Sequence, residues 1–194
     1  VAPRFDPQDV EQASHSCTLI SLVSTALQRV DARLFRSILL GGSKPPSTRP
    51  ANVIATYGLT ETGSGVVYDG YPLNGVDIRI ADDGEILINS PMNMRCYRDG
   101  TTSIDSDGWL HTNDIGALSA DGQLSVDGRR GDVIVTGAEK VWPEAVEAAL
   151  SAIIAADQFA IVGIPDPEWG ERVVLATTQS NLSLDLIKEH LFLS

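Results

Sequence analysis

Short apolar runs separated by glycines and polar breaks make up the N-terminal third of the chain. Asp6 followed by Pro7 is typical of a helix N-cap and first helical position, so we expect a short helix at about 7–13. Further apolar runs predict buried strands at 18–23, 37–40 and 53–57, with a helix at 24–30. Glycines follow the second and third runs, and the third strand is expected to stop at Gly58. This order predicts an open α/β sheet, which binds ligands at the carboxyl ends of its strands.

The pattern changes near residue 75, where apolar and polar positions begin to alternate. Apolar residues occupy every second position over 76–80, and Asp83-Gly84 then turns the chain into residues 85–89. A second Asp-Gly pair, at 121–122, again separates two apolar stretches. Alternation around Asp-Gly turns predicts two hairpins and, with them, a small antiparallel sheet or barrel over about 75–127.

A third pattern follows Gly128. Strands are predicted at 132–135, 159–164 and 172–177, and helices at 143–153 and 183–191. These elements form an α+β module of their own. We place its boundary at 128–132, a stretch of glycine and charge without apolar periodicity.

Composition excludes several classes of protein. The 194 residues carry a formal net charge of -12, which leaves no basic surface for a nucleic-acid backbone or an anionic membrane. No apolar run approaches the roughly 20 residues that a membrane-spanning helix needs, so we expect a cytoplasmic protein. The two cysteines and three histidines are scattered without the spacing of a structural zinc site or a disulfide framework.

Residues 56–63 (TYGLTETG) are the most informative stretch for function. They place an aromatic ring, hydroxyl groups and one carboxylate on a glycine-rich loop where the third predicted strand ends. Such groups can stack a base, bond a phosphate oxygen and share a magnesium ion with that phosphate. Taken alone, the stretch is more typical of an ordinary loop.

Other segments of the chain, taken in order with this loop, indicate a functional role for it. They are 41–42 (GG), 57–62 (YGLTET), 108–114 (GWLHTND), 128–132 (GRRGD), 137–143 (GAEKVWP) and 163–171 (GIPDPEWGE). Over nearly the whole chain this series resembles the adenylate-forming superfamily of acyl-CoA synthetases, luciferases and peptide-synthetase adenylation domains. Segments 57–62 and 137–139 look most like acyl-CoA ligases, including those for fatty acids. The run from 21 to 42 looks most like o-succinylbenzoate-CoA ligases.

The resemblance implies an ATP-dependent ligase that joins a small carboxylic acid to coenzyme A through an acyl-AMP intermediate, with Mg²⁺ on the nucleotide. Its fold would combine the end of a large N-terminal α/β domain at 1–74, a small antiparallel β-barrel subdomain at 75–128, and a truncated, mobile α+β C-terminal domain at 129–194. Matching positions imply adenine contacts at Gly41, Gly42, Tyr57 and Gly58. They also imply an α-phosphate contact at Thr60, a magnesium ligand at Glu61, and ribose or phosphate contacts at Asp114 and Arg129. Gly137 would lie in the loop beside the pantetheine arm of coenzyme A. Of these, Thr60 and Glu61 are the candidate catalytic residues.

Some positions depart from the family pattern. Asn113 and Ala138 stand where the family usually has glycine, although asparagine tolerates a left-handed backbone better than most residues. The family places a hinge at 128–132, and either Gly131 or Asp132 could be its pivot. The family's phosphate loop and its C-terminal lysine have no counterpart in the 194 residues, so we expect this chain alone to be inactive. Two alternatives stay open: a noncatalytic nucleotide- or acyl-binding remnant of the fold, and an adenylation domain that loads a carrier protein. Neither the acid nor the oligomeric state is indicated.

Overall fold

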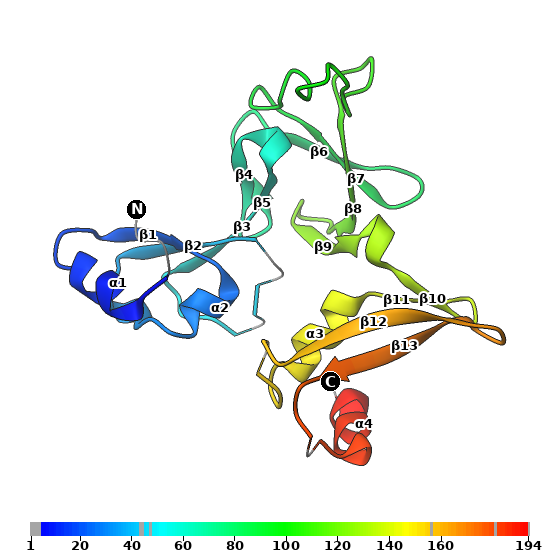
Figure 1. The fold of residues 1–194 in the computed structure, drawn as a ribbon. Coiled ribbons are helices and arrows are strands. Elements are labelled where there is room, and N and C mark those ends of the chain that lie inside the picture. Colours follow the sequence, from blue (N-terminus) through cyan, green and yellow to red (C-terminus); the bar gives the residue numbers. More distant parts are fainter. Residues whose placement is uncertain (1–4, 43–44, 47, 156, 181, 194) are drawn as a thin grey trace. The chain divides into compact units, whose positions relative to one another are not determined.

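The computed structural model describes residues 5–42, 45–46, 48–155, 157–180 and 182–193, which divide into two compact units (Figure 1). The first unit runs to Thr112 and includes Ala117–Ser125. The second consists of Asn113–Gly116 and the chain from Val126 onward. Strands β8 (Leu110–Leu118) and β9 (Leu124–Arg129) therefore contribute residues to both units.

The first unit begins with a five-stranded sheet of mixed direction. Its order is β1 (Leu19–Leu22), β2 (Ser37–Leu40), β3 (Val53–Leu59), β4 (Ser64–Tyr68) and β5 (Tyr71–Pro72), with the first three strands parallel and the rest antiparallel. Helices α1 (Pro7–Ala13) and α2 (Ser24–Leu27) and the 3₁₀ turn η1 (Ala32–Leu34) accompany it. The core that joins these elements is centred on Phe35, Ile38, Leu40 and Val53.

Local signals predicted most of this sheet. Helix α1 has the expected bounds, and the Asp6 carboxylate accepts a hydrogen bond from Gln8 N at 2.8 Å. Helix α2 ends at Leu27, earlier than predicted. The prediction that the third strand stops at Gly58 was wrong: β3 continues to Leu59 because Gly58 pairs with Gly65 of β4.

A second sheet follows, in the order β6 (Asp77–Ile80), β7 (Glu85–Asn89), β8 and β9. The antiparallel hairpin of β6 and β7 turns at Asp83-Gly84, as predicted, with Gly84 at φ +88°. The second predicted turn is closed by a hydrogen bond from Ser119 N to Gln123 O. Both Asp-Gly signals are therefore confirmed as turns.

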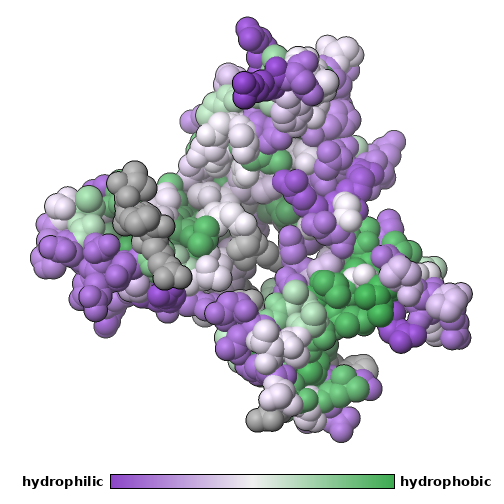
Figure 2. All heavy atoms as spheres, in the orientation of Figure 1, coloured by the Kyte–Doolittle hydropathy of each residue, from purple (hydrophilic) through white to green (hydrophobic). Residues whose placement is uncertain are grey.

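The second unit contains the sheet β11-β10-β13-β12, formed by β10 (Ile134–Thr136), β11 (Glu139–Val141), β12 (Phe159–Asp166) and β13 (Gly170–Thr177). Helices α3 (Pro143–Leu150) and α4 (Leu184–Leu193) pack on it through a core that includes Leu150, Ile161 and Ile187. Figure 2 shows apolar surface over this unit, and Val162 and Ile164 of β12 are among its exposed apolar residues.

Three details of this unit differ from the sequence prediction. The strand expected at 132–135 begins later, because the 3₁₀ turn η3 (Arg130–Asp132) precedes it. Strand β11 was not predicted, and α3 ends at Leu150. The mixed α/β class is confirmed, while the division into parts at 74 and 128 stays a prediction. Among the described residues, no helix has the length and apolar character needed to cross a membrane.

Candidate functional site

The residues that the sequence singled out fall into two sets, one on each unit. The first unit carries Gly41, Gly42, Tyr57, Gly58, Thr60 and Glu61. The second carries Asp114, Arg129 and Gly137. Each set has its own local geometry.

A hydrogen-bonded turn presents Thr60 and Glu61. They belong to the 3₁₀ turn η2 (Thr60–Thr62), which follows β3 directly. The buried Thr62 hydroxyl accepts a hydrogen bond from Leu59 N at 2.9 Å and lies 2.8 Å from Ser64 O. These contacts fix the backbone on both sides of the turn, while the Thr60 side chain remains exposed.

Glu61 is held at two points. Its carboxylate Oε1 accepts a hydrogen bond from the Tyr97 hydroxyl at 2.8 Å, and its backbone oxygen accepts one from Met94 N at 2.6 Å. In the part of the chain that the structure describes, no group of three or more His, Cys, Asp or Glu side chains could hold a metal ion. A single carboxylate nevertheless fits Mg²⁺ bound mainly by nucleotide phosphates and water, because this ion is usually held by only one or two protein carboxylates. The donor set thus fits an ion that arrives with the nucleotide.

A hollow of about 460 Å³ lies at the carboxyl ends of β1 and β2, where the open sheet was predicted to bind a ligand. Of the predicted site residues only Gly41 lines it. Its other lining residues are Phe5, Ser21, Leu22, Val23, Ala26, Leu39, Thr56, Ser64, Gly65 and Tyr68. The hollow therefore combines an aliphatic wall with four hydroxyl groups, a composition suited to an apolar ligand that carries a few polar atoms.

Gly41 keeps this hollow open. A Cβ atom at position 41 would lie 2.9 Å from Thr56 Oγ1, which donates a hydrogen bond to Leu40 O at 3.1 Å. Because side chains alternate along a strand, Tyr57 projects from the face of β3 opposite to Thr56 and does not line the hollow. The sequence therefore found the strand end but missed Thr56.

Gly42 and Gly58 are each required by the backbone. Gly42 has φ +85°, a left-handed conformation that favours glycine. A Cβ at Gly58 would lie only 2.2 Å from Ser64 O, so the close pairing of β3 with β4 admits no side chain there. Both glycines thus have a structural role that is independent of any ligand.

Asp114 and Arg129 come together in the second unit. Asp114 on β8 is buried, with 5% of its surface exposed, and its Oδ1 lies 3.2 Å from Nε of the exposed Arg129 at the end of β9. Asn113 adopts φ +58°, so the left-handed backbone expected at this glycine-like position is confirmed. The structure thus brings together two residues with the same predicted ligand.

Gly137 and Ala138 form the two-residue turn between β10 and β11. Their φ values of +56° and +71° fit a type I′ turn, whose central residues both have positive φ. The indole of Trp169 packs against Gly137, where a Cβ would come within 2.5 Å of Trp169 Cε3. Trp169 O also accepts a hydrogen bond from Gly137 N at 2.9 Å. Gly137 therefore allows this hairpin to pack against Trp169.

Comparison with known proteins decides between the possible families. No protein-family model matches the chain. A probable 2-succinylbenzoate–CoA ligase from Mycobacterium tuberculosis is 38% identical over 166 residues, which cover 79% of this chain and 42% of that protein. The o-succinylbenzoate CoA synthetase of Bacillus subtilis, solved in complex with the acyl-adenylate intermediate OSB-AMP, is similar with a TM-score of 0.80 and 28% identity, over 97% of this chain and 47% of that one. The chain belongs to the adenylate-forming superfamily.

This membership confirms the resemblance inferred from the ordered segments. The chain matches the C-terminal portion of the adenylate-forming fold and spans less than half the length of the relatives just described. The chain is also similar to an amide bond synthetase from Marinactinospora thermotolerans, with a TM-score of 0.78 and 26% identity, over 96% of this chain and 48% of that one. Neighbours of this chain thus differ in the bond that they make.

Three residues of this chain were not assigned a role from sequence. Thr56 lines the hollow, Thr62 fixes the turn, and Tyr97 bonds Glu61. Thr56 and Thr62 both lie in the segment 56–63, which the sequence had already singled out. Their positions relative to Tyr57 and Glu61 could therefore have identified them. No spacing signal links Tyr97 to Glu61, because 36 residues separate them.

Proposed function

We propose that this chain is part of an ATP-dependent carboxylic acid–CoA ligase, which forms acyl-AMP and then acyl-CoA. The observation that carries the proposal is the acyl-adenylate bound to a structural neighbour. The structural match to that neighbour covers 97% of this chain. The M. tuberculosis relative, named for a CoA ligase, supports the second half of the reaction. 2-Succinylbenzoate is therefore the first acid to test, ahead of a fatty acid.

The site residues support a division of labour in the adenylation step. The acid's carboxylate attacks the α-phosphorus of ATP, and pyrophosphate leaves. Thr60 bonds the α-phosphate, Glu61 provides a ligand for Mg²⁺, and the ion offsets phosphate charge when bound. Asp114 contacts the ribose and Arg129 contacts the ribose or a phosphate, while Gly41, Gly42, Tyr57 and Gly58 contact the adenine.

The second step transfers the acyl group. The thiolate of coenzyme A attacks the acyl carbonyl carbon, and AMP leaves with the electrons of the broken carbon–oxygen bond. This reaction needs no residue of the chain as a covalent nucleophile. Gly137 and its turn lie, in this proposal, beside the pantetheine arm of coenzyme A.

The finer architecture is part of the same proposal. Residues 1–74 end a large α/β domain, 75–128 form a β-barrel subdomain, and 129–194 begin a mobile α+β domain. The sheet β6-β7-β8-β9 and the separate core around Leu150 and Ile161 support this division. We further propose that the 194 residues alone do not form the adenylate, because none of them provides a GxxxxGK[ST] phosphate loop or a comparable one. Acid-dependent ATP–pyrophosphate exchange by the purified chain would contradict this.

A second candidate is an enzyme that passes the acyl group to an acceptor other than coenzyme A. The amide bond synthetase among the structural neighbours favours it, as does Ala138, whose methyl group stands where the family has glycine. Incubating the full-length enzyme and its acyl-adenylate with coenzyme A, a carrier protein or an amine separates the acceptors. Release of AMP that depends on coenzyme A alone supports the ligase.

The proposed function is tested by a matched pair of variants. Glu61→Ala should slow ATP–pyrophosphate exchange by the full-length enzyme, because the phosphate-bound magnesium loses an anionic ligand. Glu168→Ala removes an exposed carboxylate from the hairpin between β12 and β13 and should leave the exchange rate nearly unchanged. Equal effects of the two substitutions would remove Glu61 from the metal site.

A further inference from the structure

The loop between β7 and β8 reaches back to the turn that carries Glu61. Two residues of this loop bond Glu61, Tyr97 through the carboxylate and Met94 through the backbone. The loop backbone beside Tyr97 is closed by hydrogen bonds from Tyr97 N to Thr101 O at 2.7 Å and from Gly100 N to Tyr97 O at 3.0 Å. The phenol therefore extends from a defined turn.

The direction of the hydrogen bonds follows from the groups involved. An ionised carboxylate can only accept, so the single proton of the Tyr97 hydroxyl goes to Glu61 Oε1. The Tyr97 oxygen can then accept from the Ser103 hydroxyl, 3.3 Å away. The Tyr97 hydroxyl therefore binds one oxygen of the Glu61 carboxylate, Oε1. Among the described residues, none forms a hydrogen bond with the other oxygen, Oε2, which can accept a further ligand.

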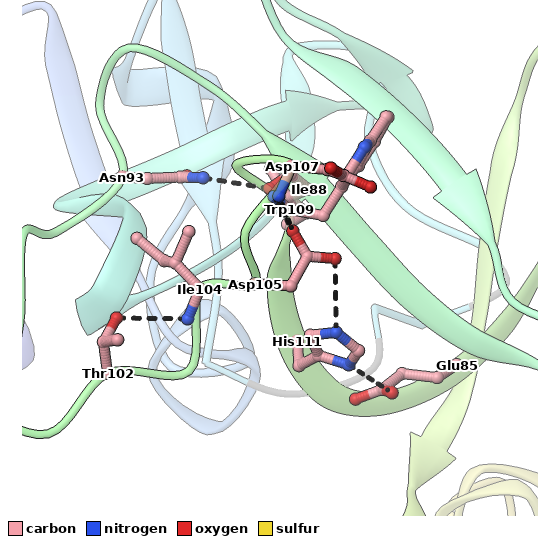
Figure 3. Close-up of polar contacts among 9 residues, drawn as sticks. All are labelled: Glu85, Ile88, Asn93, Thr102, Ile104, Asp105, Asp107, Trp109 and His111. Carbon is pink, nitrogen blue, oxygen red and sulfur yellow. Dashed lines mark hydrogen bonds and ion pairs between the residues drawn. The ribbon is translucent and has the colours of Figure 1, made fainter.

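A cluster of polar contacts anchors the same loop to the sheet (Figure 3). His111 of β8 lies between two carboxylates, with Nδ1 3.0 Å from Oε2 of the buried Glu85 and Nε2 3.7 Å from Asp105 Oδ2. Asp105 accepts hydrogen bonds from Trp109 N and Asp107 N, both at 2.9 Å. His111 N also donates to Ser103 O at 2.8 Å, which holds Ser103 beside Tyr97.

We propose that Tyr97 is a positioning residue for Glu61, whose carboxylate it holds by one oxygen so that the other can bind Mg²⁺. This inference rests on the proposed function, in which Glu61 is the magnesium ligand. A hydrogen bond to a charged group is about twice as strong as one between neutral groups, and partners that orient a metal ligand affect metal affinity by about 10- to 100-fold. The hydrogen bonds within this loop supply the defined geometry that such an effect needs.

Nucleotide binding provides a readout that does not depend on turnover. We expect Mg²⁺ to raise the affinity of the full-length protein for a nonhydrolysable ATP analogue, measured by calorimetry with MgCl₂ and with EDTA. Tyr97→Phe removes only the hydroxyl and should reduce this magnesium-dependent gain by about tenfold, while the affinity in EDTA stays the same. Tyr71→Phe is the matched control. Its hydroxyl donates to Asp121 Oδ2 at 2.9 Å, it is similarly exposed, and it should leave the gain unchanged.

The possible outcomes separate the two proposals. If the wild-type protein binds the analogue without any gain from Mg²⁺, the assignment of Glu61 fails and the role of Tyr97 fails with it. If the wild type shows the gain and Tyr97→Phe keeps it, Glu61 stands and Tyr97 does not position it. Loss of affinity in EDTA as well as in MgCl₂ would show a general disturbance of the site and would equally contradict a positioning role.

Discussion

Arg129 places its Nε 3.2 Å from Oδ1 of Asp114, which pairs an exposed guanidinium with a buried carboxylate. A charged group beside a buried carboxylate is screened less by water than one beside an exposed carboxylate, so this ion pair contributes to the local electrostatics of the site. In the proposed function, the Asp114 carboxylate accepts hydrogen bonds from a ribose, while Arg129 lies beside it.

Ribose recognition by Asp114 predicts a change in selectivity. The full-length protein should bind AMP about 10- to 100-fold more tightly than 2′,3′-dideoxy-AMP, because hydrogen bonds to a charged acceptor contribute about 1.5–3 kcal/mol. Asp114→Ala should abolish this preference by weakening AMP binding alone. Asp157→Ala, at an exposed position of the same unit, should preserve it. Titration calorimetry measures the affinities of all three proteins for both nucleotides, and a preference that survives in Asp114→Ala would assign the ribose to other residues.

The turn between β10 and β11 predicts a stabilising substitution. Ala138 adopts φ +71°, a left-handed conformation that costs an L-residue about 1–2 kcal/mol and glycine very little. Glycine also gains more freedom in the unfolded chain, so Ala138→Gly should raise the free energy of unfolding by only about 0.5–1 kcal/mol. Urea unfolding followed by tryptophan fluorescence can measure this, because Trp142 and Trp169 both lie in this unit.

The matched control for this substitution is Ala148→Gly. Ala148 is exposed within helix α3, where glycine is less favourable than alanine by about 1 kcal/mol. The same chemical change should therefore destabilise the protein at 148 and stabilise it at 138. Destabilisation at both positions would show that the left-handed backbone at Ala138 is not strained.

The loop that carries Tyr97 should lose its order in acid. The hydrogen bond from Trp109 N to the Asp105 carboxylate lowers the pKa of that group below its ordinary value of 3.8, helped by Asp107 N and by the charges of His111 and Arg79. A lowered pKa stabilises the folded loop above pH 3.8, and this contribution is lost as the pH falls through the lower pKa of the folded state. The amide signals of Trp109 and Asp107 should therefore shift together below about pH 4.

Amide NMR titration of two variants checks this assignment. Asp105→Asn should remove the acid-dependent shift of the Trp109 amide. Asp82→Asn changes an exposed carboxylate in the β6–β7 turn and should leave it in place. A shift that persists in Asp105→Asn would identify another group as the acceptor that titrates.

The sequence predicted elements best where local chemistry determines them. Asp6 caps α1, Asp-Gly pairs form the hairpin turns, and the tolerance of asparagine for positive φ identified the backbone at 113. Elements that depend on a distant partner were harder to predict. Gly58 looked like a strand end, but its pairing with Gly65 extends β3.

The chemistry of the candidate site was also more accessible to sequence than its geometry. The ordered segments identified the family and named Glu61, Asp114 and Arg129. They could not indicate that the last two form an ion pair, that Tyr97 bonds Glu61 from a distant loop, or that Gly137 receives the Trp169 ring. Each of these contacts depends on how strands far apart in sequence pair with one another, which periodicity does not encode.

The 3₁₀ turn η3 gives the proposed hinge its test. Gly131 lies at the centre of this turn, and a Cβ built on it has no atom within 4 Å, so a small side chain there meets no steric obstacle. Proline would fix φ at 131 near -65° and push Arg130 toward extended backbone, which is incompatible with the turn. Gly131→Pro should therefore favour one domain orientation over the other.

If the two half-reactions need different orientations, Gly131→Pro in the full-length enzyme should slow one of them much more than the other. We expect the larger loss in thioester formation, because the mobile domain must then leave the adenylating arrangement. Single-turnover measurements of acyl-AMP formation, and of its consumption by coenzyme A, separate the two steps. Gly131→Ala is the control, since it adds a side chain without fixing φ, and both of its rates should stay close to wild type. If proline slows the two steps equally, or slows neither of them, the pivot lies elsewhere. Asp132 would then be the next residue to examine.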